Sequence, residues 1–505
     1  MSDEDSTRST GRGGLAVAGA KIYFILLGLV QQVALPRVLG LDGYGALSRV
    51  LSITSIINNP ITAMSIQAMS RTVVHAPPEE VDASVRRILR WHAVFGVVVA
   101  ALVALATPLI ARLAGAEHVE APLRILAAII FLYSVYTPLI GIANGRKRFL
   151  VQAGFDVTAA TLRTLGLLVG AFVARRMALG GPGGAALGFV ISASVVLLIA
   201  ASAIGVGRPG PTQLTLGKYV ALALPLLLGQ ALLNLLFQAD SLLLGRFTSE
   251  AAVATGAPLA RADELVGAYR LTQMFSFLPY QILIAITFIL FPMLAAATKT
   301  GDAAAIARYV RTGVRLALII AGAMVSVTCG LAPRLLLLLF TPEVSALGGR
   351  ALGLLSLGFG AFAIFGILTT VLNSLGRERE SLWVTAGAVG IVGLLCFTRA
   401  RGGPLSEQML WLTAQATSAG LLTATGVAAY LVYRAAGALV SPWTVLRTVL
   451  SLAVSALLAR HLFPGGKLLT LVAAVVTPVV YVVILLVTRE LGRTDLAMLR
   501  QVVRR

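Results

Sequence analysis

Uncharged polar side chains recur inside long apolar segments of this 505-residue chain, at the spacing of one helix face. Steps of three and four residues keep side chains on one face of a helix. In the segment 218–246 these residues are Gln230, Asn234, Gln238 and Ser241, with Asp240 beside them. An amide surrounded by hydrocarbon must find a hydrogen-bond partner or face water. The stripe therefore predicts either helix-to-helix hydrogen bonds or a polar cavity.

Three other apolar segments carry a similar stripe. The segment 45–70 contains Ser48, Ser52, Ser55, Asn58, Asn59 and Thr62, with Pro60 interrupting it. The segment 266–296 contains Tyr269, Gln273, Ser276 and Tyr280. The segment 15–40 contains Lys21, Gly28, Gln31 and Gln32, and Lys21 is near enough to the segment's start to reach the membrane surface. Packing hydrogen bonds, worth about 0.6–2 kcal/mol each, are the alternative for any one residue. Four stripes together favour a substrate cavity.

The composition predicts an all-α integral membrane protein. Hydrophobic residues make up 58% of the chain and charged residues only 12%, which leaves too little polar material for a soluble surface. A membrane-spanning helix needs roughly 20 apolar residues. About fourteen segments meet this requirement. Within one of them, at 152–175, Asp156 and Arg163 share a helix face and are expected to form an ion pair.

A weak internal repeat predicts two similar lobes. The repeated markers are Pro108, Arg124 and Gly145-Arg146 in the first half, and Pro333, Arg350 and Gly376-Arg377 in the second. Six spans per lobe is an even number, so the lobes share an orientation and suit alternating access by rocking. The repeat pairs segment 15–40 with 218–246, and segment 45–70 with 266–296. All four striped segments thus belong to two equivalent pairs, and their cavity is expected between the lobes.

The resulting organisation has six parts, and it leaves two helices outside the repeat. They are a cytoplasmic tail at 1–14, an N-terminal lobe at 15–206, a connection at 207–217, a C-terminal lobe at 218–434, two extra helices within 443–488 and a basic cytoplasmic tail at 489–505. Lys and Arg are more frequent in the loops that share a side with the N-terminus. This bias places both termini in the cytoplasm.

The net charge of +20 raises the question of a nucleic-acid partner. The basic residues are spread over many loops instead of forming one stripe with aromatic residues, so anionic membrane lipids are the expected partners and nucleic acid is not. Cys329 and Cys396 lie in apolar segments without metal-ligand spacing, and no ATP-binding phosphate loop is present. We therefore predict no catalytic residues, no metal site and no bound cofactor.

Several short motifs resemble the polysaccharide-type flippases of the multidrug/oligosaccharidyl-lipid/polysaccharide exporter superfamily. The resemblance spans nearly the whole chain, and the order of the motifs carries it. They are Leu35-Pro36-Arg37-Val38-Leu39-Gly40 with Gly43-Tyr44-Gly45, Ser70-Arg71, Ala143-Asn144-Gly145-Arg146-Lys147-Arg148-Phe149, Val266-Gly267-Ala268-Tyr269, Phe291-Pro292 and Leu372-Asn373-Ser374-Leu375-Gly376-Arg377.

The resemblance implies a fourteen-helix transporter of the bacterial inner membrane. Similar proteins move an undecaprenyl-pyrophosphate-linked oligosaccharide to the outer leaflet, for export of O-antigen, capsule or exopolysaccharide. It further implies a drive by an H⁺ or Na⁺ gradient, and polysaccharide polymerase or chain-length machinery as partners. Lys21, Arg71 and Arg270 are then candidate contacts of the anionic head, and Asp240 is a candidate coupling or gating acid.

Three alternatives remain open at this point. A drug or cation antiporter of the same superfamily needs an acidic cavity, whereas the striped segments hold Asp240 against several basic residues. A lipid II flippase is expected to have an Arg-Asp pair in the middle of its first helix, where this chain has Gln31-Gln32. A glycan polymerase or ligase needs a large external catalytic loop, and every loop here is short.

Overall fold

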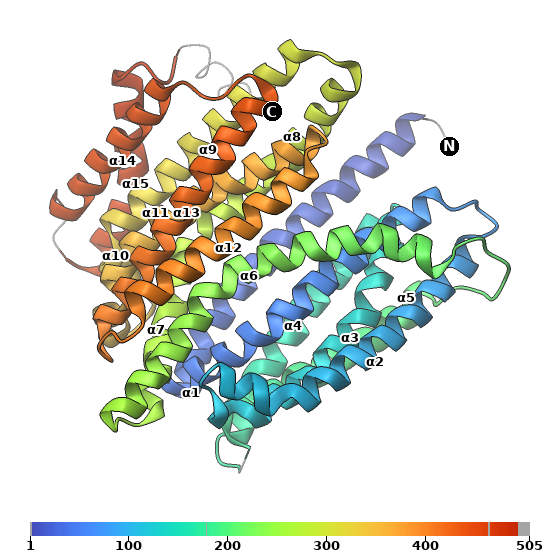
Figure 1. Ribbon diagram of the computed structural model, residues 1–505, viewed down its shortest axis with the longest axis horizontal. Coiled ribbons are helices and arrows are strands. Elements are labelled where there is room, and N and C mark those ends of the chain that lie inside the picture. The colour runs from blue at the N-terminus through green and yellow to red at the C-terminus, as the bar shows by residue number, and fades with distance from the viewer. Residues whose placement is uncertain (1–2, 178, 463–464, 493–505) are drawn as a thin grey trace. The chain divides into compact units, whose positions relative to one another are not determined.

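The computed structural model describes residues 3–177, 179–462 and 465–492, and all regular secondary structure in these ranges is helical (Figure 1). The chain forms two compact units that divide between Gly267 and Ala268. Helix α1 begins at Asp3, ahead of the start predicted at residue 15. Residues 1–2 and 493–505 of the two predicted tails lie outside the described ranges.

The first unit contains six long helices, one short 3-10 turn and the start of a seventh helix. They are α1 (Asp3–His75), α2 (Val81–Leu113), η1 (Glu117–Val119), α3 (Glu120–Gly145), α4 (Phe149–Ala174), α5 (Gly180–Ile204), α6 (Leu216–Thr255) and α7 (Leu259–Ser276). Helix α1 holds the two spans predicted at 15–40 and 45–70. Gly40, with a φ of 80°, breaks the helical geometry between them. Residues that carry a side chain rarely adopt this backbone conformation.

Helix α1 is the centre of this unit, since it packs against α3, α4 and α6. The second segment of α1 is the part that follows Gly40 and ends at His75. The hydrophobic core around it includes Met64, Met69, Ile88 and Leu139. Helices α4 and α5 approach closely because glycine lies at their contact. A Cβ atom on Gly188 would lie 1.9 Å from the carbonyl oxygen of Gly166. Small residues at such contacts are typical of membrane helices, which associate through close packing.

The second unit contains the rest of α7 and eight further helices. They are α8 (Leu278–Thr300), α9 (Ala303–Gly330), α10 (Ala332–Leu339), α11 (Pro342–Ser374), α12 (Glu378–Ala400), α13 (Glu407–Ala436), α14 (Pro442–Leu462) and α15 (Lys467–Val487). Helix α11 is the centre here, packed against α8, α9 and α13. Two predicted segments are each divided: 266–296 at Phe277, beside Pro279, and 307–340 at Leu331, beside Pro333.

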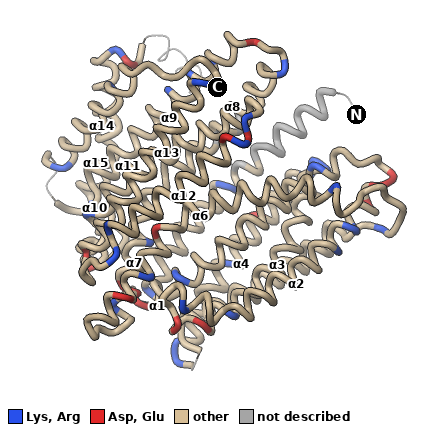
Figure 2. Tube along the Cα trace, viewed as in Figure 1, with Lys and Arg blue, Asp and Glu red and all other residues tan. Residues whose placement is uncertain are grey.

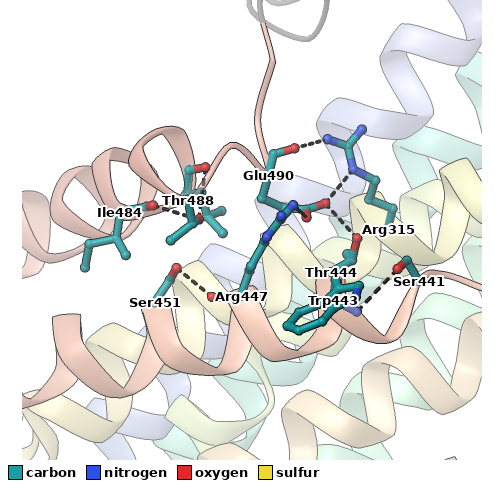
Figure 3. A network of polar contacts seen from close by, with 10 residues as sticks. Arg315, Ser441, Trp443, Thr444, Arg447, Ser451, Ile484, Thr488 and Glu490 are labelled. Atoms are coloured by element: carbon teal, nitrogen blue, oxygen red, sulfur yellow. Dashed lines mark hydrogen bonds and ion pairs between the residues drawn. The ribbon is translucent and has the colours of Figure 1, made fainter.

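The last two helices pack on α9 through small and hydroxyl side chains. Glycine on α9 permits this approach, because a Cβ on Gly322 would lie 2.3 Å from the Tyr481 hydroxyl. The opposite faces of α14 and α15 are apolar and exposed, as expected for helices that face lipid. Just after the end of α15, the carboxylate of Glu490 is buried, 2.9 Å from Arg315 Nε and 3.4 Å from Arg447 Nη1 (Figure 3). Thr444 Oγ1 donates a further bond to it at 2.9 Å. This network fastens α14 and the end of α15 to α9.

Twelve helices of the described ranges are long and apolar enough to cross a membrane. Helix α1 contains two of the predicted spans, and α7 with α8 forms the span predicted at 266–296. The count then agrees with the expected fourteen crossings. Charged residues gather near helix ends and loops, while the middles of most helices are free of them (Figure 2). The protein is therefore a multi-pass, all-α membrane protein, as the sequence predicted.

Candidate functional site

A buried charged cluster lies where the second segment of α1 begins. Arg49 Nε is 2.6 Å from Asp263 Oδ1, and the other Asp263 oxygen is 2.7 Å from His118 Nε2. The side chains of Arg49 and Asp263 are only 3% and 5% exposed. Arg49 also donates to Ser249 Oγ at 3.1 Å, to Thr248 Oγ1 at 3.2 Å and to the Gly245 carbonyl. Four groups around one guanidinium leave it little capacity to bind a ligand.

The backbone closes over this cluster. A Cβ on Gly45 would lie 1.8 Å from the carbonyl oxygen of Asp263, so α1 and α7 touch through glycine at that point. The cluster thus ties α1, η1, α6 and α7 together. Removing one partner of a buried ion pair costs about 3–5 kcal/mol, because the other charge is left without compensation. We interpret Arg49, Asp263 and His118 as structural anchors. These anchors could not be predicted from the sequence, because no local pattern joins residues so far apart in the chain.

The amides predicted on α1 and α6 meet in the first unit. Asn59 Nδ2 donates to Asn234 Oδ1 at 3.0 Å, and Asn234 donates to the Gln230 carbonyl at 3.0 Å. The Asn58 and Gln238 side chains are nearly buried, and among the described residues no group donates to their amide oxygens. A buried oxygen without a donor costs about 1–3 kcal/mol. Such oxygens are expected to accept from water or a ligand.

The polar residues of the first segment of α1 bind neighbouring side chains. Gln32 Oε1 accepts from the Tyr44 hydroxyl, and Gln31 Oε1 lies 3.5 Å from the Thr164 hydroxyl. Lys21 is 59% exposed and pairs with Asp156 at 2.9 Å.

The ion pair expected between Asp156 and Arg163 is therefore wrong. The Arg163 guanidinium lies instead over the Phe189 ring, 5.1 Å from its centroid. A lysine on a neighbouring helix reaches the carboxylate, and the arginine finds an aromatic face.

Asp240 is almost fully buried on α6, at 1% exposure. One of its oxygens accepts the backbone N–H of Ser241 at 2.7 Å. A carboxylate in this position is costly unless other groups compensate it, which makes it a group whose charge state matters.

In the second unit, Arg270, Gln273 and Tyr280 lie around the break between α7 and α8. Arg270 Nη1 donates to Gln273 Oε1 at 3.1 Å, and Gln273 is buried. The Tyr280 ring lies 5.8 Å from Phe277 and 5.0 Å from Phe362, between centroids. Basic, amide and aromatic groups thus follow one another along this stretch.

Arg71 lies at the other end of α1, beside an open pocket of about 570 Å³. His75, Glu80 and Lys218 also line this pocket, which includes part of the connection at 207–217. The Arg71 side chain is exposed, and within the described ranges no carboxylate pairs with it. Glu80 is engaged by the backbone N–H of Gln213 at 2.9 Å. Two cations therefore face the pocket with one carboxylate that is already hydrogen-bonded.

Hydrogen bonds to α2 hold the wall of this pocket in place. Arg87 donates to the carbonyls of Thr212 and Leu214, at 3.3 and 2.9 Å, and Ser84 shares a 2.8 Å bond with the Thr212 hydroxyl.

Lys218 was not predicted as a site residue, although its place just after a Pro- and Gly-containing connection was a signal that could have found it. A volume of this size suits a ligand larger than a single phosphate.

A model of the family described as polysaccharide biosynthesis protein matches residues 10–298, which is more than half of the chain. The chain belongs to this family. A search of curated proteins finds no match. Among solved structures, the chain is similar to one titled lipid II flippase MurJ, in an inward closed conformation. The TM-score is 0.75 at 12% identity, covering 95% of this chain and 99% of the other.

Two transporter structures resemble the chain as well. A multidrug resistance MATE family transporter of the MOP superfamily, in an inward-facing conformation, has a TM-score of 0.62 at 16% identity, covering 84% of this chain and 98% of the other. A mutant of the Vibrio cholerae MATE transporter VcmN has a TM-score of 0.60 at 17% identity, covering 85% and 96%. The family match confirms the predicted polysaccharide-type family, and at these identities the structures establish the fold alone.

The described residues of this polysaccharide biosynthesis protein contain no group of three His, Cys, Asp or Glu placed to hold a metal ion. Within the same ranges, Cys329 donates to the Gly353 carbonyl and Cys396 lies 3.6 Å from the Thr417 hydroxyl. Both cysteines therefore behave as small interior residues. In the first unit, Arg71 and Lys218 line an open pocket, while Asn58 and Gln238 carry buried amide oxygens to which no described residue donates.

Proposed function

We propose that this chain is a flippase for a polyprenyl-pyrophosphate-linked oligosaccharide. It would carry the head group from the cytoplasmic to the outer leaflet of the bacterial inner membrane. The observation that carries the proposal is the Arg71 pocket, where Arg71 and Lys218 face open space at one end of the spans. A pyrophosphate is doubly charged or more, and guanidinium and ammonium groups are its usual protein ligands.

The physical need for such a carrier follows from the two parts of the substrate. A charged pyrophosphate and hydroxyl-rich sugars are strongly disfavoured in hydrocarbon, whereas the polyprenyl chain is at home there. Only the head therefore needs a polar route. The amide oxygens of Asn58 and Gln238, to which no described residue donates, are suited to accept hydrogen bonds from sugar hydroxyls along that route.

Alternating access would expose the head site first to the cytoplasm and then to the outside. An H⁺ or Na⁺ gradient would supply the energy, with the buried Asp240 as the coupling or gating acid. Lys21 and Arg270 are further candidate contacts for the head group. Export of O-antigen, capsule or exopolysaccharide, and partnership with a polymerase or chain-length protein, are the wider roles that this activity would serve.

The orientation of the chain places the Arg71 pocket in the cytoplasm when both termini are cytoplasmic. Arg71, Lys218, Arg86, Arg87 and the basic run at 146–148 then share the inner face, as the positive-inside bias requires. The same residues would attract anionic lipids to this side. Cysteine labelling of positions 71 and 218 from each side of intact cells would test the orientation independently of transport.

A complementation experiment tests the function. A bacterial host that lacks its own flippase is given the wild-type gene or a variant, and surface glycan is measured at matched membrane levels of the protein. Arg71→Ala combined with Lys218→Ala is expected to restore less than about a tenth of the glycan, since each charge-assisted contact is worth about 1.5–3 kcal/mol. Arg208→Ala is the matched control, because Arg208 is an exposed residue of the same connection that does not line the pocket.

Three outcomes would count against the proposal. Full restoration by Arg71→Ala and Arg270→Ala would show that these residues do not hold the head group. Purified protein that moved organic cations and no lipid-linked sugar would identify a drug antiporter. Rescue of peptidoglycan synthesis without rescue of surface glycan would identify a lipid II flippase.

A further inference from the structure

A second basic pocket lies in the second unit, at the ends of α9 and α14. Its volume is about 570 Å³, and its lining includes Arg334, Arg350, Arg460, His461 and Trp411. Small residues of α9 and α11, such as Gly330 and Gly349, form part of its wall. Among the described residues that line it, none is acidic. Three guanidinium groups around one space predict an anionic ligand.

Arg334 is fixed in place by the end of α14. Its Nη2 donates to the Arg460 carbonyl at 3.1 Å, and its Nη1 to the Ala459 carbonyl at 3.5 Å. The last carbonyls of a helix carry partial negative charge and would repel an anion. Because Arg334 satisfies two of them, the end of α14 no longer opposes an anion in this pocket.

Arg350 and Trp411 supply a second wall with both charge and an aromatic face. The Arg350 guanidinium lies 5.4 Å from the centroid of the Trp411 ring. Glu407 Oε1 is 3.7 Å from Arg350 Nη1, and both side chains are well exposed to solvent. An exposed pair of this kind is worth about 0–1 kcal/mol, so Arg350 can exchange it for a stronger anion.

Membrane topology does not explain why this pocket is positively charged. By the order of the spans along the chain, the end of α9 and the end of α1 face opposite sides of the membrane. The positive-inside bias accounts for basic residues on one side only. Whichever side is cytoplasmic, one of the two basic pockets therefore needs another reason to exist. With cytoplasmic termini, the pocket of Arg350 is the one on the outside.

We propose that this pocket binds a phosphate group at the membrane surface opposite the Arg71 pocket. Arg350 and Arg460 contact the phosphate oxygens, and Arg334 holds the end of α14 in position. The pocket is larger than a phosphate requires, and Trp411 offers a flat face for the rest of the ligand. A phospholipid headgroup and a free phosphate share this chemistry, and the experiment distinguishes them. The inference does not depend on the proposed transport activity.

The test uses the full-length protein purified in a neutral detergent. Binding of a short-chain phosphatidylglycerol and of inorganic pyrophosphate is measured by equilibrium methods, with phosphatidylcholine as the zwitterionic reference. We expect phosphatidylglycerol to bind at least about tenfold more tightly than phosphatidylcholine. Arg350→Ala combined with Arg460→Ala is expected to weaken binding by about tenfold or more.

Three further variants keep the result interpretable. Arg399→Ala removes an exposed arginine near the end of α12, on the same side of the membrane and outside the pocket lining, and is expected to bind as the wild type does. Arg350→Lys combined with Arg460→Lys keeps the charge and is expected to recover part of the affinity. In an Arg71→Ala background, the double alanine change at Arg350 and Arg460 is expected to remove the same amount of binding as in the wild type, so failure here and failure of the transport proposal are separable.

Binding of phosphatidylglycerol that is lost in the double alanine variant supports a lipid headgroup as the ligand. Binding of pyrophosphate alone, lost in the same variant, supports a soluble phosphate. Equal affinity of the wild type and the double alanine variant for both probes would overturn the proposal. So would an equal loss in Arg399→Ala, since the effect would then be a general one of surface charge.

Discussion

The two ends of the second segment of α1 use arginine in opposite ways. Arg49, near its start, is buried and surrounded by an ion pair and three further acceptors. Arg71, near its end, is exposed beside an open pocket, and no carboxylate of the described residues pairs with it. The same side chain thus serves as an anchor at one end and is free for a ligand at the other. The chemical surroundings, more than the residue type, indicate function.

The second unit repeats this contrast. Arg315 and Arg447 hold the buried carboxylate of Glu490 at one end of α9 and α14 (Figure 3). Arg334, Arg350 and Arg460 face a pocket at the other end of the same helices. Each unit therefore has a closed, paired cluster and an open basic pocket. The contrast predicts that variants of the first kind affect stability and variants of the second kind affect binding.

The largest effect is expected for Asp263→Ala. This change leaves Arg49 buried without its partner and should lower the free energy of unfolding by about 3–5 kcal/mol. Thermal unfolding in detergent, followed by circular dichroism, measures the loss. Glu264→Ala is the control, because Glu264 pairs with Arg261 at a part-exposed position of the same helix. An unchanged unfolding midpoint for Asp263→Ala would show that Arg49 is not an anchor.

A smaller loss of stability is expected for Glu490→Gln. The glutamine keeps the volume but removes the charge that compensates Arg315 and Arg447, whose side chains are partly exposed to solvent. Partial solvation should limit the cost to about 1–3 kcal/mol. The same unfolding assay applies, and limited proteolysis near α14 and α15 should become faster. If proteolysis quickened only in the first unit, the fastening role of Glu490 would be wrong.

For Arg71→Ala we expect the reverse pattern. The unfolding midpoint should stay within about a degree of the wild type, since exposed substitutions usually change stability by less than about 0.5 kcal/mol. Transport should fall by about tenfold or more. A fall in stability that matched the fall in transport would erase the distinction between the two ends of α1.

The smallest effect is expected for Asn234→Ala. Loss of the bond to Asn59 between α1 and α6 should cost about 0.6–1.7 kcal/mol, the range measured for such bonds between membrane helices. Transport of a long oligosaccharide should decline more than transport of a short one if the amides bind sugar. Equal declines for both would assign Asn59 and Asn234 to packing alone.

Most of the fold could be predicted from the sequence because lipid imposes a strong pattern. Apolar segments of about 20 residues located nearly every span, and Pro279 and Pro333 mark the places where two of them divide. The break in α1 at Gly40 falls between the two predicted spans, but its form was less visible. A glycine can end a helix or kink it, and only the surrounding packing decides which.

The site was harder to predict because its contacts join distant parts of the chain. The meeting of Asn59 with Asn234 followed from the stripes on their helices, since a stripe must face a neighbour. The pairing of Lys21 with Asp156 did not, because the local spacing favoured Arg163. Arg49 with Asp263, and the basic cluster at the end of α14, have no local signal at all. Long-range packing alone brings those charges together.

Transport in reconstituted vesicles tests the central claim most directly. Purified protein is placed in liposomes with a fluorescent polyprenyl-pyrophosphate oligosaccharide, and a membrane-impermeant enzyme or quencher reports its appearance in the outer leaflet. We expect rapid movement with the wild type and with Arg208→Ala, and at least about tenfold slower movement with Arg71→Ala combined with Lys218→Ala. Equal rates for all three, or a wild-type rate no faster than protein-free liposomes, would contradict that claim.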